Sequence, residues 1–342
     1  MNQPGTSEKA TTPVRPLVAV EDLRVRFVTK DRTVHAVNGV DFTLAPGEVL
    51  CILGESGSGK SVTLRALMRL LPKHRAQLSG KVVVAGEDVT AMSERQLQQL
   101  RGGTLAMIFQ EPMTALDPVF TLGTQITETI IRHDRVSRTE ANRRALELLE
   151  LVQIPSAKRR LAAYPHELSG GLRQRAMIAM ALSCRPSVLL ADEPTTALDA
   201  TVQIQILLLL RSLQKQLGMG VLFVTHDLGV AGEIADRIAV MYAGRMVETG
   251  SVVDVMRNPL HPYTQGLLGA TVHGGLRGQR LTTIPGSPPN LEYLGAGCSF
   301  APRCAHATPR CDGEPPPAVS IGADRMARCV LVEKSAAEAA GG

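Results

Sequence analysis

The sequence predicts an α/β protein in which a parallel sheet lies between helices, followed by a smaller cysteine-rich segment. Short runs of aliphatic and β-branched residues alternate with stretches of helical periodicity, which is typical of parallel sheets whose strands are buried on both faces. One of these runs ends in a glycine-rich turn that leads directly into a helix. After about Asn258 the composition changes to many prolines and glycines, and this change predicts the separate cysteine-rich segment.

The expected elements begin after a polar, proline-rich stretch and alternate along the chain. Each expected strand is a short run of aliphatic or β-branched residues, and each expected helix has apolar residues at helical spacing. Pro72 and Gly218 mark two helix ends, because proline cannot continue a helix and glycine favours its C-cap. The strands are expected at 17–27, 33–44, 48–53, 187–191 and 221–225, and the helices at 61–71, 172–183 and 199–217.

The overall composition is that of a globular protein of about two domains. The 342 residues are 44% hydrophobic and 20% charged, so a sizeable core is expected. Aromatic residues make up 3% and tryptophan is absent, so this core is aliphatic and a binder of single-stranded nucleic acid is disfavoured. The net charge of +5 comes from scattered lysines and arginines, which is typical of a solvated surface.

The expected location is the cytosol. No apolar run approaches the ~20 residues needed to cross a bilayer, and residues 1–16 lack the apolar stretch of a secretory signal. In the cytosol, the six cysteines are expected to be buried, metal-bound or catalytic rather than joined in disulfides. Residues 1–16 and 334–342 are expected to be flexible tails.

A glycine-rich motif follows the strand expected at 48–53. It fits the pattern G-x-x-x-x-G-K-S between a strand and a helix, the context that such a motif requires. Its backbone amides turn toward the phosphates of a nucleotide, and the helix N-terminus adds partial positive charge. Lys60 is expected to reach the β- and γ-phosphates, and the Ser61 hydroxyl is suited to Mg²⁺. The predicted nucleotide site comprises Gly54, Glu55, Ser56, Gly57, Ser58, Gly59, Lys60, Ser61 and Val62.

A second motif is the strand expected at 187–191, which is followed by two acids, Asp192 and Glu193. A carboxylate at the carboxyl end of a parallel strand lies beside the phosphate-binding turn, where Asp192 can hold Mg²⁺ through water. Glu193 is placed to orient and polarise an attacking water.

A third motif predicts another anion site. Ser169 is expected to cap a helix, and Gly170 and Gly171 permit a ligand to approach the helix N-terminus closely. One nucleotide does not need two such sites in one chain. The second site is therefore expected to face a nucleotide that another subunit holds.

These motifs together resemble those of the ATPase subunits of ABC transporters. The run Leu-Ser-Gly-Gly-x-x-Gln, which ends at Gln174, resembles their signature, and Gln110 corresponds to their glutamine loop. Asp199, in the run Ala197-Leu198-Asp199, resembles their D-loop residue, and His226 their switch histidine. The resemblance implies a P-loop NTPase core with a parallel sheet, a helical subdomain and an antiparallel β subdomain.

The resemblance also implies a head-to-tail pair of ATPase subunits, identical or paralogous, with ATP between them. Mg²⁺ would be bound by Ser61, Gln110 and Asp192. The implied catalytic residues are Lys60, Gln110, Glu193 and His226, of which His226 would contact the γ-phosphate. The neighbouring subunit's nucleotide would be contacted by Ser169, Gly170, Gly171, Gln174 and Asp199.

Two local features resemble the oligopeptide/dipeptide and nickel importer branch. One is the run at 111–120, and the other is the run at 258–264 together with 284–291. The resemblance covers about 17–332 and implies an ATP-hydrolysing motor at the cytoplasmic face of the cell membrane. Its implied partners are a second ATPase subunit, two transmembrane permease subunits and an extracytoplasmic substrate-binding protein, without nucleic acid. The implied transport is the uptake of di- or oligopeptides, with nickel or another small solute as the alternative.

Three other functions are alternatives: an exporter motor, a soluble ABC-type ATPase acting on nucleic acid or ribosomes, and an inactive regulatory subunit. The chain has one phosphate-binding motif and no heptad run, which disfavours the second, and its complete set of motif residues disfavours the third. The expected division is an ATPase domain at 17–257, with the helical subdomain at about 112–185, and an extension at 258–333. ABC subunits usually place an aromatic ring against adenine, and Phe27 is the one candidate before Val34, although it could instead point into the core.

The four cysteines Cys298, Cys304, Cys311 and Cys329 lie in the proline- and glycine-rich segment, with 5, 6 and 17 residues between them. The absence of a Cys-x-x-Cys pair weakens a zinc site, whereas iron–sulfur spacings vary more. The segment resembles the C-terminal domain of peptide-importer ATPases, some of which hold a 4Fe–4S cluster with four cysteines. Zinc and no metal are the alternatives, and a structural role is favoured over a redox one. Cys51 and Cys184 are expected to be small buried hydrophobic residues.

Overall fold

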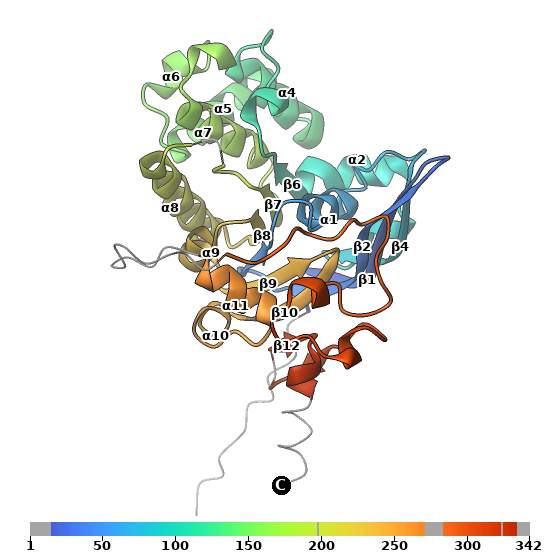
Figure 1. The fold of residues 1–342 in the computed structure, drawn as a ribbon. Helices are drawn as coiled ribbons and strands as arrows, with labels where there is room; N and C mark the ends of the chain where they lie inside the picture. The colour runs from blue at the N-terminus through green and yellow to red at the C-terminus, as the bar shows by residue number, and fades with distance from the viewer. Residues whose placement is uncertain (1–14, 197, 271–282, 323, 334–342) are drawn as a thin grey trace, which may run out of the picture.

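The computed structural model describes residues 15–196, 198–270, 283–322 and 324–333. These residues form two sheets, a cluster of helices at one end and a carboxyl-terminal segment at the other (Figure 1). Ala197 and most of the two expected tails lie outside the described residues. Within the described ranges, no helix is long and apolar enough to cross a lipid bilayer.

The larger sheet has eight strands, and its centre is parallel as the sequence predicts. β3 (Val49–Leu53) lies between β8 (Gly220–Thr225) and β9 (Arg237–Tyr242), and the parallel set continues from β8 through β7 (Val188–Asp192) to β6 (Leu105–Ile108). All residues of β3, β7 and β8 are buried, because other elements cover both faces of the sheet. The parallel strands end along one edge, so the residues that follow them lie close together.

An antiparallel edge extends this sheet. β10 (Arg245–Ser251) pairs antiparallel with β9, and two short strands, β12 (Met326–Ala327) and β11 (Val319–Ser320), follow. The sequence does not predict these strands, since the last two come from the proline-rich region. They join that region to the central sheet through backbone pairing.

The smaller sheet is antiparallel throughout and has the strand order β2, β1, β4, β5. Its first two strands confirm the two expected at 17–27 and 33–44 to within one residue. Its apolar face and the central sheet enclose an aliphatic core, as the low aromatic content predicts. The strands are β1 (Val18–Val28), β2 (Thr33–Leu44), β4 (Ala76–Val84) and β5 (Glu87–Asp88).

The helix after the glycine-rich turn is shorter than the expected 61–71. α1 (Lys60–Leu67) begins one residue earlier and ends well before Pro72. Arg69 takes a left-handed conformation with φ of 49°, through which a right-handed helix does not continue. The expected extent is therefore wrong at the carboxyl end.

Two further expected helices are present with small shifts at their ends. α7 (Gly170–Ala181) corresponds to the helix expected at 172–183 and begins and ends two residues earlier. α8 (Ala200–Leu217) corresponds to the helix expected at 199–217 and begins one residue later. Gly218 follows α8 with φ of 64°, which confirms it as the C-cap.

The helical cluster lies at the upper end of the molecule in Figure 1, beyond the ends of β6 and β7. Two of its helices begin at serine or threonine N-caps, Thr121 and Ser137, whose side chains accept backbone N–H groups. Besides α7, its elements are α3 (Pro112–Ala115), α4 (Leu122–Asp134), α5 (Arg138–Leu151), α6 (Ala157–Arg160) and η2 (Pro165–Glu167). The remaining elements before the proline-rich region are η1 (Val89–Ala91), α2 (Glu94–Gly103), α9 (Leu228–Ile234) and α10 (Val252–Arg257).

The described residues from Pro259 to Glu333 are called the C-terminal segment below. Apart from β11 and β12, its regular elements are α11 (Pro262–Gly269), η3 (Ala301–Arg303) and η4 (Pro309–Cys311). After residue 282 the chain crosses from the region of α11 toward β2 as an extended strap (Figure 1). The strap is fastened there by a hydrogen bond from the N–H of His35 to the carbonyl of Leu291, 2.9 Å long.

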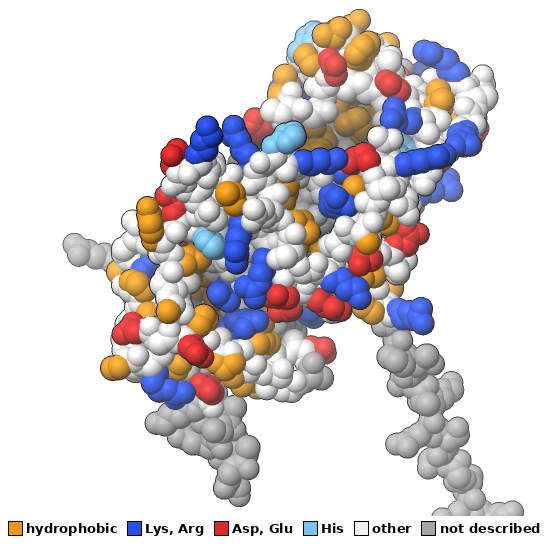
Figure 2. All heavy atoms as spheres, turned by 90° about the vertical axis from the view of Figure 1, so that its right-hand side faces the viewer, with side chains coloured by type: hydrophobic (Ala, Val, Ile, Leu, Met, Phe, Trp, Pro, Cys, Tyr) orange, Lys and Arg blue, Asp and Glu red, His pale blue; other side chains and the backbone are white. Residues whose placement is uncertain are grey.

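Charged side chains of both signs are interspersed over the face that Figure 2 shows. This distribution is the one expected from scattered lysines and arginines.

Candidate functional site

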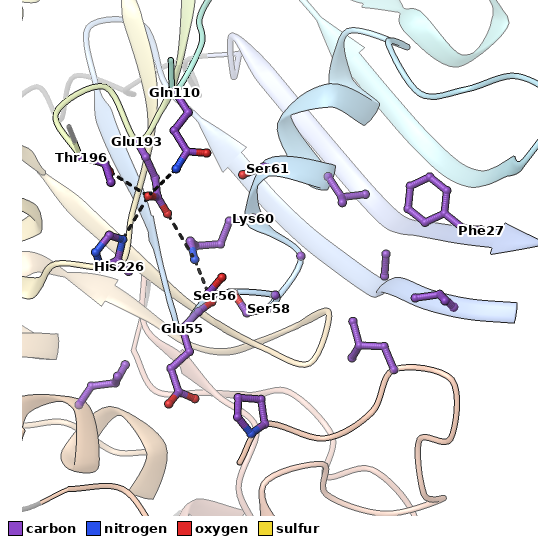
Figure 3. A pocket seen from close by; sticks show the side chains of 18 residues that line it. Phe27, Glu55, Ser56, Ser58, Lys60, Ser61, Gln110, Glu193, Thr196 and His226 are labelled. Carbon is purple, nitrogen blue, oxygen red and sulfur yellow. Dashed lines mark hydrogen bonds and ion pairs between the residues drawn. The ribbon is translucent and has the colours of Figure 1, made fainter. Parts of the chain in front are cut away.

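A cavity of about 920 Å³ opens beside the carboxyl ends of the parallel strands (Figure 3). The residues after β3 form the glycine-rich loop on its floor. β6 is followed by Gln110, β7 by Glu193 and β8 by His226, and all three side chains line the cavity. The parallel sheet therefore brings motifs together that are far apart in the sequence.

The glycine-rich loop can take its shape only because two positions lack a side chain. A Cβ atom on Gly54 would lie 2.2 Å from the carbonyl oxygen of Met241. Gly59 has φ of 106°, and a Cβ atom there would lie 2.4 Å from the carbonyl oxygen of Ala36. All predicted loop residues from Glu55 to Val62 line the cavity, whereas Gly54 lies behind it against β9.

Lys60 is the cation of this cavity. Its side chain is 4% exposed, and Nζ donates hydrogen bonds to the carbonyls of Gly54 at 2.7 Å and Glu55 at 2.9 Å. Burial lowers the pKa of Lys60, and the carboxylates of Glu193 and Asp192 oppose that effect. A buried ammonium group held at the loop is suited to bind phosphate oxygens.

Ser61 and Asp192 form the oxygen-rich part of the site. The Ser61 hydroxyl donates to Oδ1 of Asp192 at 2.7 Å, although the two residues belong to α1 and β7. Asp192 is 1% exposed, and burial raises its pKa while the bond from Ser61 lowers it. Hydroxyl and carboxylate oxygens so close together fit a Mg²⁺ ion, which prefers such ligands.

Glu193 is the centre of a polar network in the cavity. Its carboxylate accepts hydrogen bonds from Thr196 Oγ1 at 2.9 Å and from Gln110 Nε2 at 3.4 Å. Nδ1 of His226 lies 3.2 Å from Oε2 of Glu193, and Nζ of Lys60 lies 4.0 Å from Oε1 (Figure 3). The predicted residues Lys60, Gln110, Glu193 and His226 thus meet around one carboxylate.

The backbone of Glu193 is strained, with φ of 45°, a value that is uncommon for a residue other than glycine. Its N–H donates to the carbonyl of Val224 on the neighbouring strand at 3.0 Å, which holds this conformation. Strained backbone of this kind persists where the surroundings fix it, often at functional sites. Thr196, three residues further on, is not predicted from the sequence, because a single threonine after an acidic pair belongs to no motif of its own.

The signature residues lie elsewhere. In the described part of the chain, the lining of the cavity does not include the signature and D-loop residues Ser169, Gly170, Gly171, Gln174 and Asp199. Ser169 and Gly170 are exposed at the N-terminus of α7, and Asp199 is exposed at the start of α8, where its side chain accepts the N–H of Val202. The chain therefore presents this surface outward, away from its own glycine-rich loop.

Two details differ from the expectations for this surface. Ser169 occupies the N-cap position, but its hydroxyl makes no capping hydrogen bond, so the expected side-chain cap is wrong. The residue as a whole is exposed. Gln174 is 1% exposed and lies inside the helical cluster, so its side chain is not part of the outward surface.

The far wall of the cavity is apolar. Phe27 is half-buried and lines it, together with Val34 and Ala36 of β2. The C-terminal segment adds Pro288 and Leu291 from its strap. The wall is suited to the flat face of a nucleotide base, and the strap's contribution was not expected from the sequence.

The four cysteines of the C-terminal segment lie around one small pocket, with His261 and Phe300 also in its lining. All six cysteines are free, and burial raises the pKa of Cys298, Cys304 and Cys329. The N–H of His306 points at the sulfur of Cys304, 3.4 Å away. In the described part of the chain, no group of three or more histidine, cysteine or acidic side chains is arranged to hold a metal ion.

The other two cysteines lie in the body of the protein. Cys51 is fully buried in β3, as expected, and Cys184 is half-buried after α7. Burial raises the pKa of both thiols.

The sequence matches two family models. The model of the ABC transporter matches residues 37–196, and the model of the oligopeptide/dipeptide transporter C-terminal region matches residues 247–311. The first covers most of the motifs that line the cavity. The second includes three of the four clustered cysteines.

Several known proteins are similar over nearly their whole length. A putative peptide import ATP-binding protein of Brucella abortus (strain 2308) is 50% identical over 335 residues, which is 94% of this chain and 99% of that protein. The oligopeptide transport ATP-binding protein OppD of Salmonella typhimurium is 48% identical over 311 residues, 91% of this chain and 92% of that protein. The dipeptide transport ATP-binding protein DppD of Bacillus subtilis is 47% identical over 297 residues, 86% and 89%.

Solved structures of ATP-binding cassettes share the fold. One is a dimer in a post-hydrolysis state bound to ADP and Pi, with a TM-score of 0.62 and 29% sequence identity. It covers 69% of this chain and 98% of the other.

Proposed function

This chain belongs to the ABC transporter family of ATP-binding proteins, in its peptide-import branch, and on that premise we propose that it is the ATP-hydrolysing motor of an importer for oligopeptides or dipeptides. The observation that carries the proposal is the meeting of Lys60, Gln110 and His226 around Glu193 in one cavity beside the phosphate-binding loop. The peptide substrate class is supported by the relatives, which are named for peptide import. Nickel and export are the alternatives that the relatives disfavour.

The roles proposed within the cavity follow from these contacts. The loop amides and Lys60 bind the phosphates, and Glu193 orients and polarises the attacking water. His226 contacts the γ-phosphate, and Gln110 reports on its presence. Mg²⁺ held by Ser61, Asp192 and Gln110 would neutralise charge that develops on the transferring phosphoryl group.

The exposed signature surface is proposed to complete a second subunit's site. Ser169, Gly170 and Gly171 lie outside this chain's own cavity, so they are free to contact a nucleotide bound by a partner, with Asp199 beside them. Gln174 is buried, so its proposed part is to support this surface from behind. The partner is an identical chain or a paralogue.

The wider assembly is proposed from the family. Two transmembrane permease subunits and an extracytoplasmic substrate-binding protein complete the importer, and the ATPase pair lies at the cytoplasmic face of the membrane. The chain is divided into an ATPase domain at 17–257 and an extension at 258–333, with a helical subdomain at about 112–185. The match of the second family model to 247–311 supports a separate extension.

We propose that Cys298, Cys304, Cys311 and Cys329 hold a 4Fe–4S cluster, with zinc as the alternative. The support is that all four side chains line one pocket and that backbone N–H groups point at two of the sulfurs. Hydrogen bonds to sulfur are typical of cluster sites. The cluster would cross-link a segment that has few aliphatic residues and little regular structure, so its role is structural.

Uptake by the assembled transporter tests this function. The complete complex in proteoliposomes, with the binding protein outside and ATP inside, is expected to accumulate a labelled di- or oligopeptide. The same complex with Glu193→Gln is expected to fail. Accumulation of nickel without any peptide, or ATP-independent peptide uptake, would contradict the proposal.

A further inference from the structure

The C-terminal segment reaches directly into the phosphate-binding loop. Glu55 lines the cavity, and its side chain points away from Gln110 and Glu193 (Figure 3). Its two carboxylate oxygens accept hydrogen bonds from Arg303, at 2.7 Å from Nη1 and 3.1 Å from Nη2. This paired contact joins residues that are 248 positions apart in the sequence.

Arg303 is also held by contacts outside the loop. Its side chain is 5% exposed, and Nε donates to the carbonyl of Pro285 at 2.8 Å. Nη1 also donates to the hydroxyl of Tyr242 at 3.3 Å, and the guanidinium carbon lies 5.8 Å from the centre of that ring. Four of the five N–H donors of Arg303 are directed in this way, and an arginine held so loses little further conformational freedom on pairing.

A second contact from the C-terminal segment fixes the backbone of the same loop residue. The N–H of Glu55 donates to the hydroxyl of Tyr263 at 2.9 Å, and Tyr263 is fully buried. The carbonyl of Glu55 accepts from Lys60. The amide, the carbonyl and the side chain of Glu55 are thus all held, two of the three by the C-terminal segment.

Charge explains why this arrangement bears on nucleotide binding. The loop binds anionic phosphates through its amides, and Glu55 adds a negative charge to it. Arg303, which does not line the cavity itself, neutralises that charge. Without Arg303, a half-buried carboxylate would remain unpaired at the phosphate site and would repel the ligand.

We infer that Arg303 and Tyr263 are positioning residues that hold the phosphate-binding loop in its nucleotide-binding form, so that the C-terminal segment sets the affinity for ATP. This inference rests on the proposed ATPase function. Neither residue lines the cavity, and both act through Glu55, which does.

The test uses the full-length chain and the dissociation constant of MgATP measured by calorimetry. Arg303→Met is expected to weaken binding about tenfold, because it leaves one partner of a partly buried charge pair alone. Glu55→Gln is expected to weaken it less, since the charge left without an anionic partner is then the cation Arg303, which does not repel phosphate. The double variant is expected to bind better than Arg303→Met alone, and Tyr263→Phe is expected to weaken binding while preserving the ring.

The matched control is Arg328→Met. Arg328 also precedes a clustered cysteine, and its ion pair with Asp41 of β2, 3.5 Å long, also ties the C-terminal segment to the body of the protein without touching the loop. The affinity of the Arg328→Met variant for MgATP is expected to equal that of the unaltered chain. Melting temperatures without nucleotide separate lost stability from lost affinity, because a merely structural role lowers them and leaves the dissociation constant unchanged.

Two results would overturn the inference. The first is an unchanged dissociation constant in folded Arg303→Met or, if that variant does not fold, in Arg303→Lys and Tyr263→Phe. The second is a double variant no better than Arg303→Met. If the unaltered chain itself does not bind MgATP, the proposed function fails instead.

Discussion

The strand-end edge of the central sheet and the C-terminal segment build their contacts in opposite ways. At the edge, each parallel strand delivers one functional side chain immediately after it ends, as β7 delivers Glu193 and β8 delivers His226. The C-terminal segment has few strands and helices, and single side chains such as Arg303 attach it to the loop. Regular structure positions the first region, whereas individual polar contacts position the second.

This difference predicts how substitutions act in the two regions. A change at the strand-end edge removes a group that touches nucleotide, so it is expected to alter binding or turnover by a large factor. A change in the C-terminal segment acts through another residue or through a cross-link. Its effect is expected to be smaller or to appear in stability.

The largest effect is expected from Lys60→Ala. The substitution removes the buried cation that donates to the loop carbonyls and is directed at phosphate, so the affinity for ATP is expected to fall about 100-fold or more. Fluorescence titration with a labelled ATP analogue measures it. Undiminished affinity in the folded variant would contradict the assignment of the loop.

Glu193→Gln is expected to lower turnover about 100-fold while ATP binding persists. The amide keeps the shape of the side chain but cannot polarise water as the carboxylate does. Steady-state hydrolysis and nucleotide affinity, measured on the same sample, separate the two effects. Turnover equal to that of the unaltered chain would exclude Glu193 as the base.

Phe27→Ala is expected to weaken ATP binding about tenfold, since base–aromatic stacking is worth about 1–3 kcal/mol. Leu291 and Pro288 remain on the same wall, so binding is reduced rather than lost. Comparing ATP with inorganic triphosphate gives the control, because only the ligand with a base should respond. An equal loss for both ligands would show that Phe27 acts on the loop instead.

In the C-terminal segment, Cys311→Ser is expected to abolish the iron and acid-labile sulfide of anaerobically purified protein and to lower its melting temperature. Nucleotide affinity is expected to change least of all the properties measured. Cys184→Ser, outside the pocket of the four clustered cysteines, is the matched control. This variant should retain the iron and acid-labile sulfide and the melting temperature of the unaltered chain. An unaltered chain that contains zinc and no iron would contradict the proposed cluster.

The same contrast explains what could be predicted from the sequence. Lys60, Asp192 and Glu193 could be predicted because each belongs to a motif that follows an apolar run recognisable as a buried strand, whereas His226 was implied only by the resemblance to ABC-transporter ATPase subunits. Thr196 belongs to the same cavity but was missed, because its role depends on where the turn after β7 brings it.

The contacts of the C-terminal segment could not be predicted at all. Arg303 lies in a proline-rich region where no periodicity fixes its position, and its partner Glu55 is predicted from the sequence only as part of the nucleotide site, without a partner in the C-terminal segment. The pairing depends on a path of the chain that passes the strap and η3. The predicted ends of the helices were also imperfect. The left-handed conformation of Arg69 stops α1, and no proline or glycine at that position signals this in the sequence.

The central claim is that each nucleotide site needs the signature surface of a second subunit, and Ser169→Arg tests it most directly. Ser169 is exposed and lies outside the chain's own cavity, so the variant is expected to bind ATP normally. Its turnover in the assembled ATPase pair is expected to fall sharply, because the large side chain blocks the partner's site. Full turnover in that variant, at every protein concentration, would contradict the account.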